Sequence, residues 1–159
     1  MVVGGKLGGM KWTGWIELQA GMLRRLNRLR PSHGAAHLMT GVEGEREALF
    51  YLRRAGYTVV ARRWRSPKLW GDVDLIGWDG EWLCFVEVKT RTGRDANEPA
   101  ESAVDEEKRR MLRRMARAYL GRFPRGQRDE VPVRFDVMSV YLQPSGHEFE
   151  LYRGAFGWR

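Results

Sequence analysis

Two neighbouring apolar stretches of the sequence carry three charged residues that could act together in metal chemistry. Asp74 lies within "VDLIG", and Glu87 and Lys89 lie within "FVEVK". Side chains alternate between the two faces of a strand, so Glu87 and Lys89 share one face. If the Asp79-Gly80 turn joins the stretches as a hairpin, Asp74 can lie on that face too. Two carboxylates and an ammonium would then meet at one edge of a sheet.

Charges in such an apolar setting are costly unless they are paired or bind a metal. A Glu–Lys pair in a strand is ordinarily a salt bridge, and this interpretation stays open for Glu87 and Lys89. The third charge favours a metal, because two close carboxylates repel each other and a divalent cation removes the repulsion. Oxygen ligands without His or Cys suit Mg²⁺ or Mn²⁺ rather than zinc.

Two predicted helices each direct one charged residue toward the sheet. In the first, over residues 42–56, Glu45 lies one turn before Leu49 on the apolar stripe. In the second, over residues 101–122, Lys108 interrupts the apolar stripe. Each residue could instead reach solvent from near a helix end.

The elements that must position these residues predict one α/β domain. Residues 1–41 are Gly-rich and basic and are expected to form a flexible tail, which leaves residues 42–159 as the domain. Its expected order is α-β-β-β-α-β-β, a mixed β-sheet flanked by helices. The strands are predicted from period-two patterns and turn residues at 57–64, 72–78, 81–91, 133–142 and 147–153.

Composition narrows the functional classes. The formal net charge of +8 permits a polyanionic partner, but residues 1–42 contribute six Lys or Arg against one Glu, so most of the excess lies outside the domain. The single cysteine, Cys84, excludes a disulfide within the chain and fits a reducing cytoplasm. No apolar run approaches the roughly 18–20 residues that a membrane-spanning helix needs.

A few further residues have both functional and structural interpretations. Trp70, in a loop, could stack on a nucleobase, and together with Lys108 and Arg91 it is a candidate nucleic-acid contact. Asp136 with Arg134 favours a structural ion pair. The arginines of the second helix form either a solvated face or a phosphate-binding ridge: Arg109, Arg110, Arg113, Arg114 and Arg117.

The spacing from Asp74 to Glu87-Val88-Lys89 resembles the PD-(D/E)xK nuclease signature. With a helix on either side, it looks like the restriction-endonuclease-like core, with a topology close to the archaeal Holliday junction resolvases. Several blocks, in order, are similar to the YraN family of bacterial proteins over about residues 42–159. They are "GEREALFYLRRAGYTVVARRWRS", "GDVDLIGWDGEWLCFVEVKTR", residues 99–108, "RFDVMSV" and "GAF".

The resemblance implies roles for individual residues. Asp74, Glu87 and the Val88 carbonyl would bind Mg²⁺ or Mn²⁺, and Lys89 would be the catalytic lysine. Glu45 and Lys108 match the helix glutamate and helix lysine of the family. The sequence departs from the pattern at two positions, since Val73 replaces the proline of the nuclease motif and Asp72 replaces the usual glutamate.

The expected function is therefore that of a cytoplasmic, metal-dependent endonuclease acting on DNA, including branched intermediates of repair and recombination. A homodimer is a further expectation, because enzymes that cut branched DNA often work as two-fold dimers. One alternative is a non-catalytic nucleic-acid-binding module that assists a repair or recombination partner. Another is an interaction protein in which the same charges form ion pairs.

Overall fold

The structure is a computed structural model that describes residues 36–91 and 104–158 of the 159-residue chain. The chain divides into two units, residues 1–36 and 37–159. The predicted tail lies outside the described residues up to position 35. The elements are α2 (Ala36–Arg54), β1 (Thr58–Trp64), β2 (Val73–Asp79), β3 (Trp82–Arg91), α3 (Glu106–Leu120), β4 (Val133–Gln143) and β5 (Gly146–Phe156).

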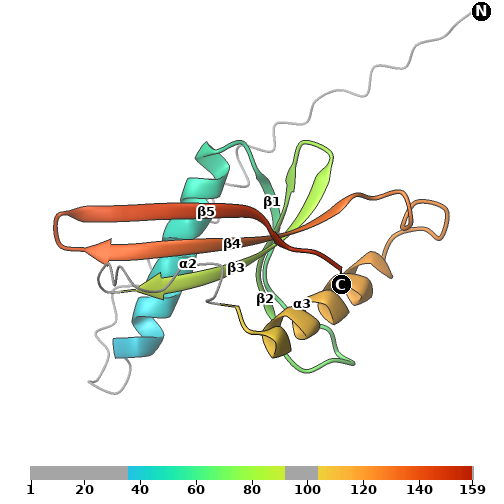
Figure 1. Cartoon of the computed structure of the whole chain (residues 1–159), viewed down its shortest axis with the longest axis horizontal. Coiled ribbons are helices and arrows are strands. Elements are labelled where there is room, and N and C mark those ends of the chain that lie inside the picture. Colours follow the sequence, from blue (N-terminus) through green and yellow to red (C-terminus); the bar gives the residue numbers. More distant parts are fainter. Residues whose placement is uncertain (1–35, 92–103, 159) are drawn as a thin grey trace, which may run out of the picture. The chain divides into compact units, whose positions relative to one another are not determined.

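The strands form one five-stranded sheet in the order β1-β2-β3-β4-β5 (Figure 1). Neighbouring strands are antiparallel except β3 and β4, which are parallel and are connected by a segment that contains α3. The mixed sheet and the α-β-β-β-α-β-β order confirm the predicted fold class. The architecture is consistent with a restriction-endonuclease-like core.

The two helices pack against different faces of the sheet, because successive strand residues point to opposite sides. The α2 cluster joins helix residues such as Leu49 and Leu52 to Leu75 of β2 and Val86 of β3. The α3 cluster joins helix residues to the alternate strand positions, among them Phe85 of β3. The face that carries Phe85 is therefore the face that carries Glu87 and Lys89.

The predicted hairpin joins β2 and β3, but its turn consists of Gly80 and Glu81, one residue later than the predicted Asp79-Gly80, because Asp79 ends β2 and pairs with Trp82. Gly80 has a φ of +59°, in the left-handed region that this turn requires. The strands pair antiparallel from Asp79 with Trp82 to Leu75 with Val86. This register fixes which residues meet at the far end of the hairpin.

Both helix starts differ from their predicted positions. Helix α2 begins at Ala36 rather than residue 42, because the cost of an interior glycine such as Gly41, about 1 kcal/mol, does not end a packed helix. Helix α3 begins at Glu106 rather than residue 101, because the Asp105 side chain caps it by accepting from the Lys108 N–H at 2.8 Å. Residues 101–103 lie outside the described part.

The arginines of α3 do not form one solvated face. Arg113 is 8% exposed, and its guanidinium donates to the Gly157 carbonyl at 2.8 Å and to Glu106 at 2.9 Å. Arg109 and Arg113 both lie over the Phe156 ring. The five arginines thus form neither a continuous solvated face nor a continuous phosphate-binding ridge, because Arg109 and Arg113 contact the C-terminal residues.

Over the described ranges, no helix is both long enough and apolar enough to cross a bilayer.

Candidate functional site

Strands β2 and β3 bring Asp74 and Glu87 opposite each other. The printed register ends with Leu75 paired to Val86, so the next position outward on each strand is Asp74 and Glu87. There the Val88 N–H donates to Asp74 Oδ2 at 2.7 Å instead of to a backbone carbonyl. The carboxylate of Asp74 therefore takes the place of a ladder hydrogen bond, at the point where the two strands part.

Glu87 is a buried carboxylate held by two lysines. It is 3% exposed. Lys89 Nζ lies 3.1 Å from Oε1, and Lys108 Nζ lies 2.9 Å from Oε2. The contact with Lys108 lacks hydrogen-bond geometry, so Oε2 is a buried oxygen that accepts no hydrogen bond. Strand β3 and helix α3 thus supply both cations that compensate this one charge.

Asp74 is strained electrostatically in the ionised state. Burial raises the pKa of Asp74, and the nearby Glu87 carboxylate raises it further, to about 7. The hydrogen bond from Val88 and the charge of Lys108 act in the opposite direction. Burial and the neighbouring carboxylate therefore both disfavour the ionised form of Asp74.

The two carboxylates stabilise the charged form of Lys108. Burial lowers the pKa of Lys108, but the attraction of Glu87 and the charge of Asp74 outweigh burial, and the net pKa is raised. An ammonium this firmly charged acts as an electrostatic partner rather than as a proton donor. Its position on α3 confirms that this helix directs one charge onto the sheet.

Glu45 approaches the site from α2 but is engaged elsewhere. Arg63 binds it with two hydrogen bonds, from Nε at 2.7 Å and from a terminal nitrogen at 2.9 Å. The register places Arg63 opposite Asp74, between the pairs Arg62–Leu75 and Trp64–Val73. Arg63 has a φ of +45°, an unusual conformation for a residue other than glycine. This backbone conformation at Arg63 therefore lies at the border of the site, opposite Asp74.

The other predicted contacts lie around this centre. Arg91 ends β3 on the face of Glu87 and Lys89, paired in register with Tyr141. Trp70 is 95% exposed in the loop that leads into β2. The structure thus brings Asp74, Glu87, Lys89 and Lys108 together. It places Glu45 beside them in an ion pair, and Trp70 and Arg91 at the margins.

The donor set can be compared with the needs of a divalent cation. Within the described ranges, no group of three or more His, Cys, Asp and Glu side chains is gathered closely enough to hold a metal. Two carboxylates do meet, however, and Glu87 Oε2 is a buried oxygen whose near neighbour is the Lys108 ammonium, at 2.9 Å. In a strand, the carbonyl of a residue points to the same side as its N–H, so the Val88 carbonyl faces Asp74. These three oxygen donors fit Mg²⁺ or Mn²⁺ with water completing the shell.

Some of these side-chain contacts were not predicted from the sequence. The Arg63–Glu45 pair depends on a backbone bend that no local pattern signals. A buried network around Asp136 was predicted only for Arg134, which binds it at 2.8 and 3.1 Å. The Tyr57 hydroxyl also donates to Asp136, at 3.1 Å. The isolated polar Tyr57 before an apolar strand was the available signal.

Comparisons with known proteins agree with one another. The model of a family described as an uncharacterised protein family, UPF0102, matches residues 44–140. A UPF0102 protein of Koribacter versatilis is 49% identical over 120 residues, which cover 76% of this chain and 80% of the relative. One of Solibacter usitatus is 46% identical over 143 residues, covering 90% and 98%. One of Rhodococcus opacus is 41% identical over 126 residues, covering 77% and 99%.

Proposed function

We propose that this chain, which belongs to the UPF0102 (YraN) family, is a divalent-metal-dependent nuclease that hydrolyses phosphodiester bonds of DNA. Branched intermediates of repair and recombination are included among its substrates. The observation that carries the proposal is the facing pair of Asp74 and Glu87 at the splayed end of a hairpin. An ordinary structural ion pair needs one carboxylate, whereas this site gathers two.

Two side chains and one backbone carbonyl would bind the cation. Asp74, Glu87 and the Val88 carbonyl would hold it, and Val88 N–H fixes the orientation of Asp74 through its 2.7 Å hydrogen bond. When bound, a divalent cation neutralises charge on a phosphate and lowers the pKa of a coordinated water. Its uptake would relieve the repulsion between the two carboxylates.

The lysines would act on the substrate. Lys89 Nζ, 3.1 Å from Glu87 Oε1, is placed to stabilise negative charge that develops on the phosphate in the transition state. Lys108 Nζ, on the other oxygen of the same carboxylate, would contact a neighbouring phosphate oxygen once a cation neutralises Glu87. Glu45 would have to leave Arg63 before it could orient water.

The test compares the wild type with three variants on labelled single-stranded, duplex, flap and four-way-junction DNA in Mg²⁺ or Mn²⁺. The Asp74→Ala/Glu87→Ala double variant and Lys89→Ala should each lose at least about 100-fold in cleavage rate. Glu81→Ala, which removes an exposed carboxylate in the hairpin turn, is the control and should cut normally. Normal cutting by Lys89→Ala would refute the assignment.

A second function is favoured by one specific observation. Both oxygens of Glu87 are already neutralised by lysines, and both oxygens of Glu45 are bound by Arg63. A non-catalytic module that binds nucleic acid beside a repair or recombination partner would keep such pairs intact. It predicts equal DNA binding by the wild type and the double variant, with no metal-dependent cutting by either.

A further inference from the structure

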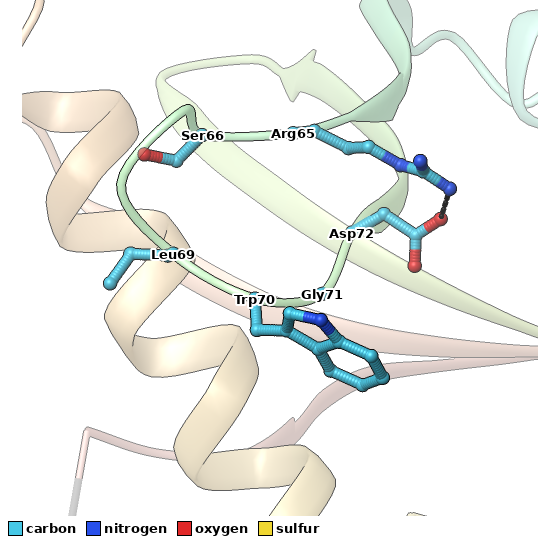
Figure 2. A pocket seen from close by; sticks show the side chains of 6 residues that line it. All are labelled: Arg65, Ser66, Leu69, Trp70, Gly71 and Asp72. Carbon is cyan, nitrogen blue, oxygen red and sulfur yellow. Dashed lines mark hydrogen bonds and ion pairs between the residues drawn. The ribbon is translucent and has the colours of Figure 1, made fainter.

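The loop between β1 and β2 displays an aromatic side chain to solvent. Trp70 is 95% exposed, against 45% for Trp82 and 37% for Trp158. The indole therefore contributes little burial to the fold and leaves an aromatic face open to a ligand. Figure 2 shows the indole projecting from the loop, next to Asp72 and Gly71.

The loop that carries Trp70 is tied down on both sides of it. Leu69 packs against the core cluster on the α3 face. Gly71 has a φ of +112°, and a Cβ there would lie 2.7 Å from the sulfur of Met111 on α3. Arg65 and Asp72 close the loop with a 3.5 Å ion pair, drawn as a dashed line in Figure 2. Trp70 is therefore held out by a fixed frame, which reduces the entropy cost of binding.

The same loop forms a small pocket beside the indole. Its volume is about 350 Å³, near the lower end for small-molecule sites and suited to a single ring system. Its walls combine apolar surface with hydroxyl, guanidinium and carboxylate groups that can bind polar ring edges. The lining residues are Arg65, Ser66, Leu69, Trp70, Gly71 and Asp72 (Figure 2).

The pocket adjoins the candidate metal site along the chain. Three residues separate Trp70 from Asp74, so the α-carbons of these two residues, four positions apart, lie within about 14 Å. Arg65 and Lys68 add exposed positive charge to the loop. A nucleic-acid strand with a phosphate at Asp74 and Glu87 would thus have the aromatic face of Trp70, and the cations of Arg65 and Lys68, near its neighbouring nucleotide.

We infer that the Trp70 loop binds an unpaired nucleobase of a nucleic-acid strand whose phosphate lies at the Asp74–Glu87 site. The inference rests on the proposed function, which supplies the phosphate. Aromatic side chains bind single strands by stacking on base faces. In an intact duplex those faces are covered by neighbouring bases. The substrate class is therefore a strand with at least one unpaired base, as in single-stranded, flap or branched DNA.

The experiment measures binding separately from cleavage. Full-length Asp74→Asn protein in EDTA is titrated into fluorescein-labelled 12-nucleotide DNA, the same DNA as a blunt duplex, and the same sequence as RNA, at one salt concentration. Trp70→Ala and Trp70→Phe are made in that background. Trp82→Ala is the matched control, because Trp82 is also exposed but begins β3 at the opposite end of the hairpin.

Stacking predicts a pattern rather than a single loss. Trp70→Ala should bind the single strand about tenfold more weakly, and Trp70→Phe and Trp82→Ala within about twofold of the parent. Duplex binding should be unchanged. The base itself is located with a series of 12-mers, each lacking one base. One member of the series should bind the parent protein about tenfold more weakly than the intact strand does. The same member should bind Trp70→Ala as tightly as the intact strand does, because that variant has no indole for the base to stack on. Comparison of DNA with RNA identifies which polymer supplies the base.

The outcomes separate this inference from the nuclease. The base site is refuted if Trp70→Ala binds the single strand as tightly as its parent does. It is also refuted if the substitution weakens binding to the duplex and to the single strand equally. Both results hold whatever the cleavage assay shows. If the wild type never cuts but Trp70→Ala selectively loses the single strand, the nuclease is refuted and the base site stands.

Discussion

Gly44 of α2 and Thr90 of β3 touch where the helix crosses the strand. A Cβ added at Gly44 would lie 1.8 Å from Thr90 Oγ1 and 2.7 Å from its Cβ, so only glycine fits without movement. Glu45 and Lys89, the neighbours of these two residues, are thereby held at a fixed separation. The site depends on this backbone approach as much as on its charged groups.

Gly44→Ala should lower the free energy of unfolding by about 1–3 kcal/mol, because the helix must shift away from β3. Gly41→Ala is the matched control in the same helix, since a Cβ there meets nothing within 4 Å. It should be neutral or stabilising by up to about 1 kcal/mol. Chemical denaturation of both variants checks the prediction, and equal stabilities would show that the contact has no energetic weight.

The fold was largely predictable because its signals are local. The apolar stretches around Asp74 and Glu87 alternate with period two, and Asp79-Gly80 is a hairpin turn by composition. That Asp74 and Glu87 share a face follows from these two facts, but their direct opposition depends on a turn at Gly80 and Glu81, one residue later than predicted. The partner of Glu45 did not follow, because it depends on a left-handed backbone at Arg63, and this conformation is set by contacts between elements distant in sequence.

Asp74→Asn should stabilise the metal-free protein at high pH. The pKa of this carboxyl is 3.8 in its ordinary state and about 7 in the fold. The folded state therefore holds its proton more tightly, and wild-type stability falls as pH rises from about 4 through 7. Asparagine has no such proton and can still accept from Val88. We expect a gain of about 2 kcal/mol at pH 8 that shrinks toward pH 4.

Urea denaturation in EDTA at pH 8, 6 and 4 measures this difference. The exposed Glu81→Gln serves as the control and should change stability by less than about 0.5 kcal/mol at each pH. A pH-independent effect of Asp74→Asn would mean that burial and Glu87 do not disfavour the ionised form. The same variant should lose cleavage, so stability and function would move in opposite directions.

Lys108→Met should raise the affinity for a divalent cation. The ammonium lies 2.9 Å from Glu87 Oε2 and competes for that oxygen. Its removal leaves a buried charge with only Lys89 beside it, which should cost about 2 kcal/mol without metal. Saturating Mg²⁺ should recover much of this loss, seen as a larger metal-induced rise in melting temperature than in the wild type.

The control for Lys108 lies two residues further along the same helix. Arg110 is exposed and pairs with Glu106 at 3.6 Å, away from the carboxylate pair. Arg110→Gln should leave both the stability and the response to Mg²⁺ unchanged. If Lys108→Met and Arg110→Gln respond alike to Mg²⁺, the cation does not bind at Glu87.

Arg134→Met should destabilise the fold without affecting the site. Arg134 binds the fully buried Asp136 and reaches Asp79 at 2.6 Å. Asp136 is paired in register with Val86, on the α2 face, whereas Glu87 lies on the other. Loss of the guanidinium leaves a buried carboxylate without its cation, which should cost about 3–5 kcal/mol. At a temperature where the variant is folded, DNA binding should match the wild type.

A second substitution distinguishes a lost charge partner from a lost side-chain volume. Arg134→Met/Asp136→Asn removes the uncompensated charge and should recover part of the stability, since the amide oxygen can still accept from the Gly154 N–H and the amide nitrogen can donate to the Tyr57 hydroxyl. Arg153→Met is the matched control, because Arg153 reaches Asp79 at 3.2 Å but is half exposed. It should cost less than about 1 kcal/mol. If the double variant is no more stable than Arg134→Met, packing rather than charge determines the loss.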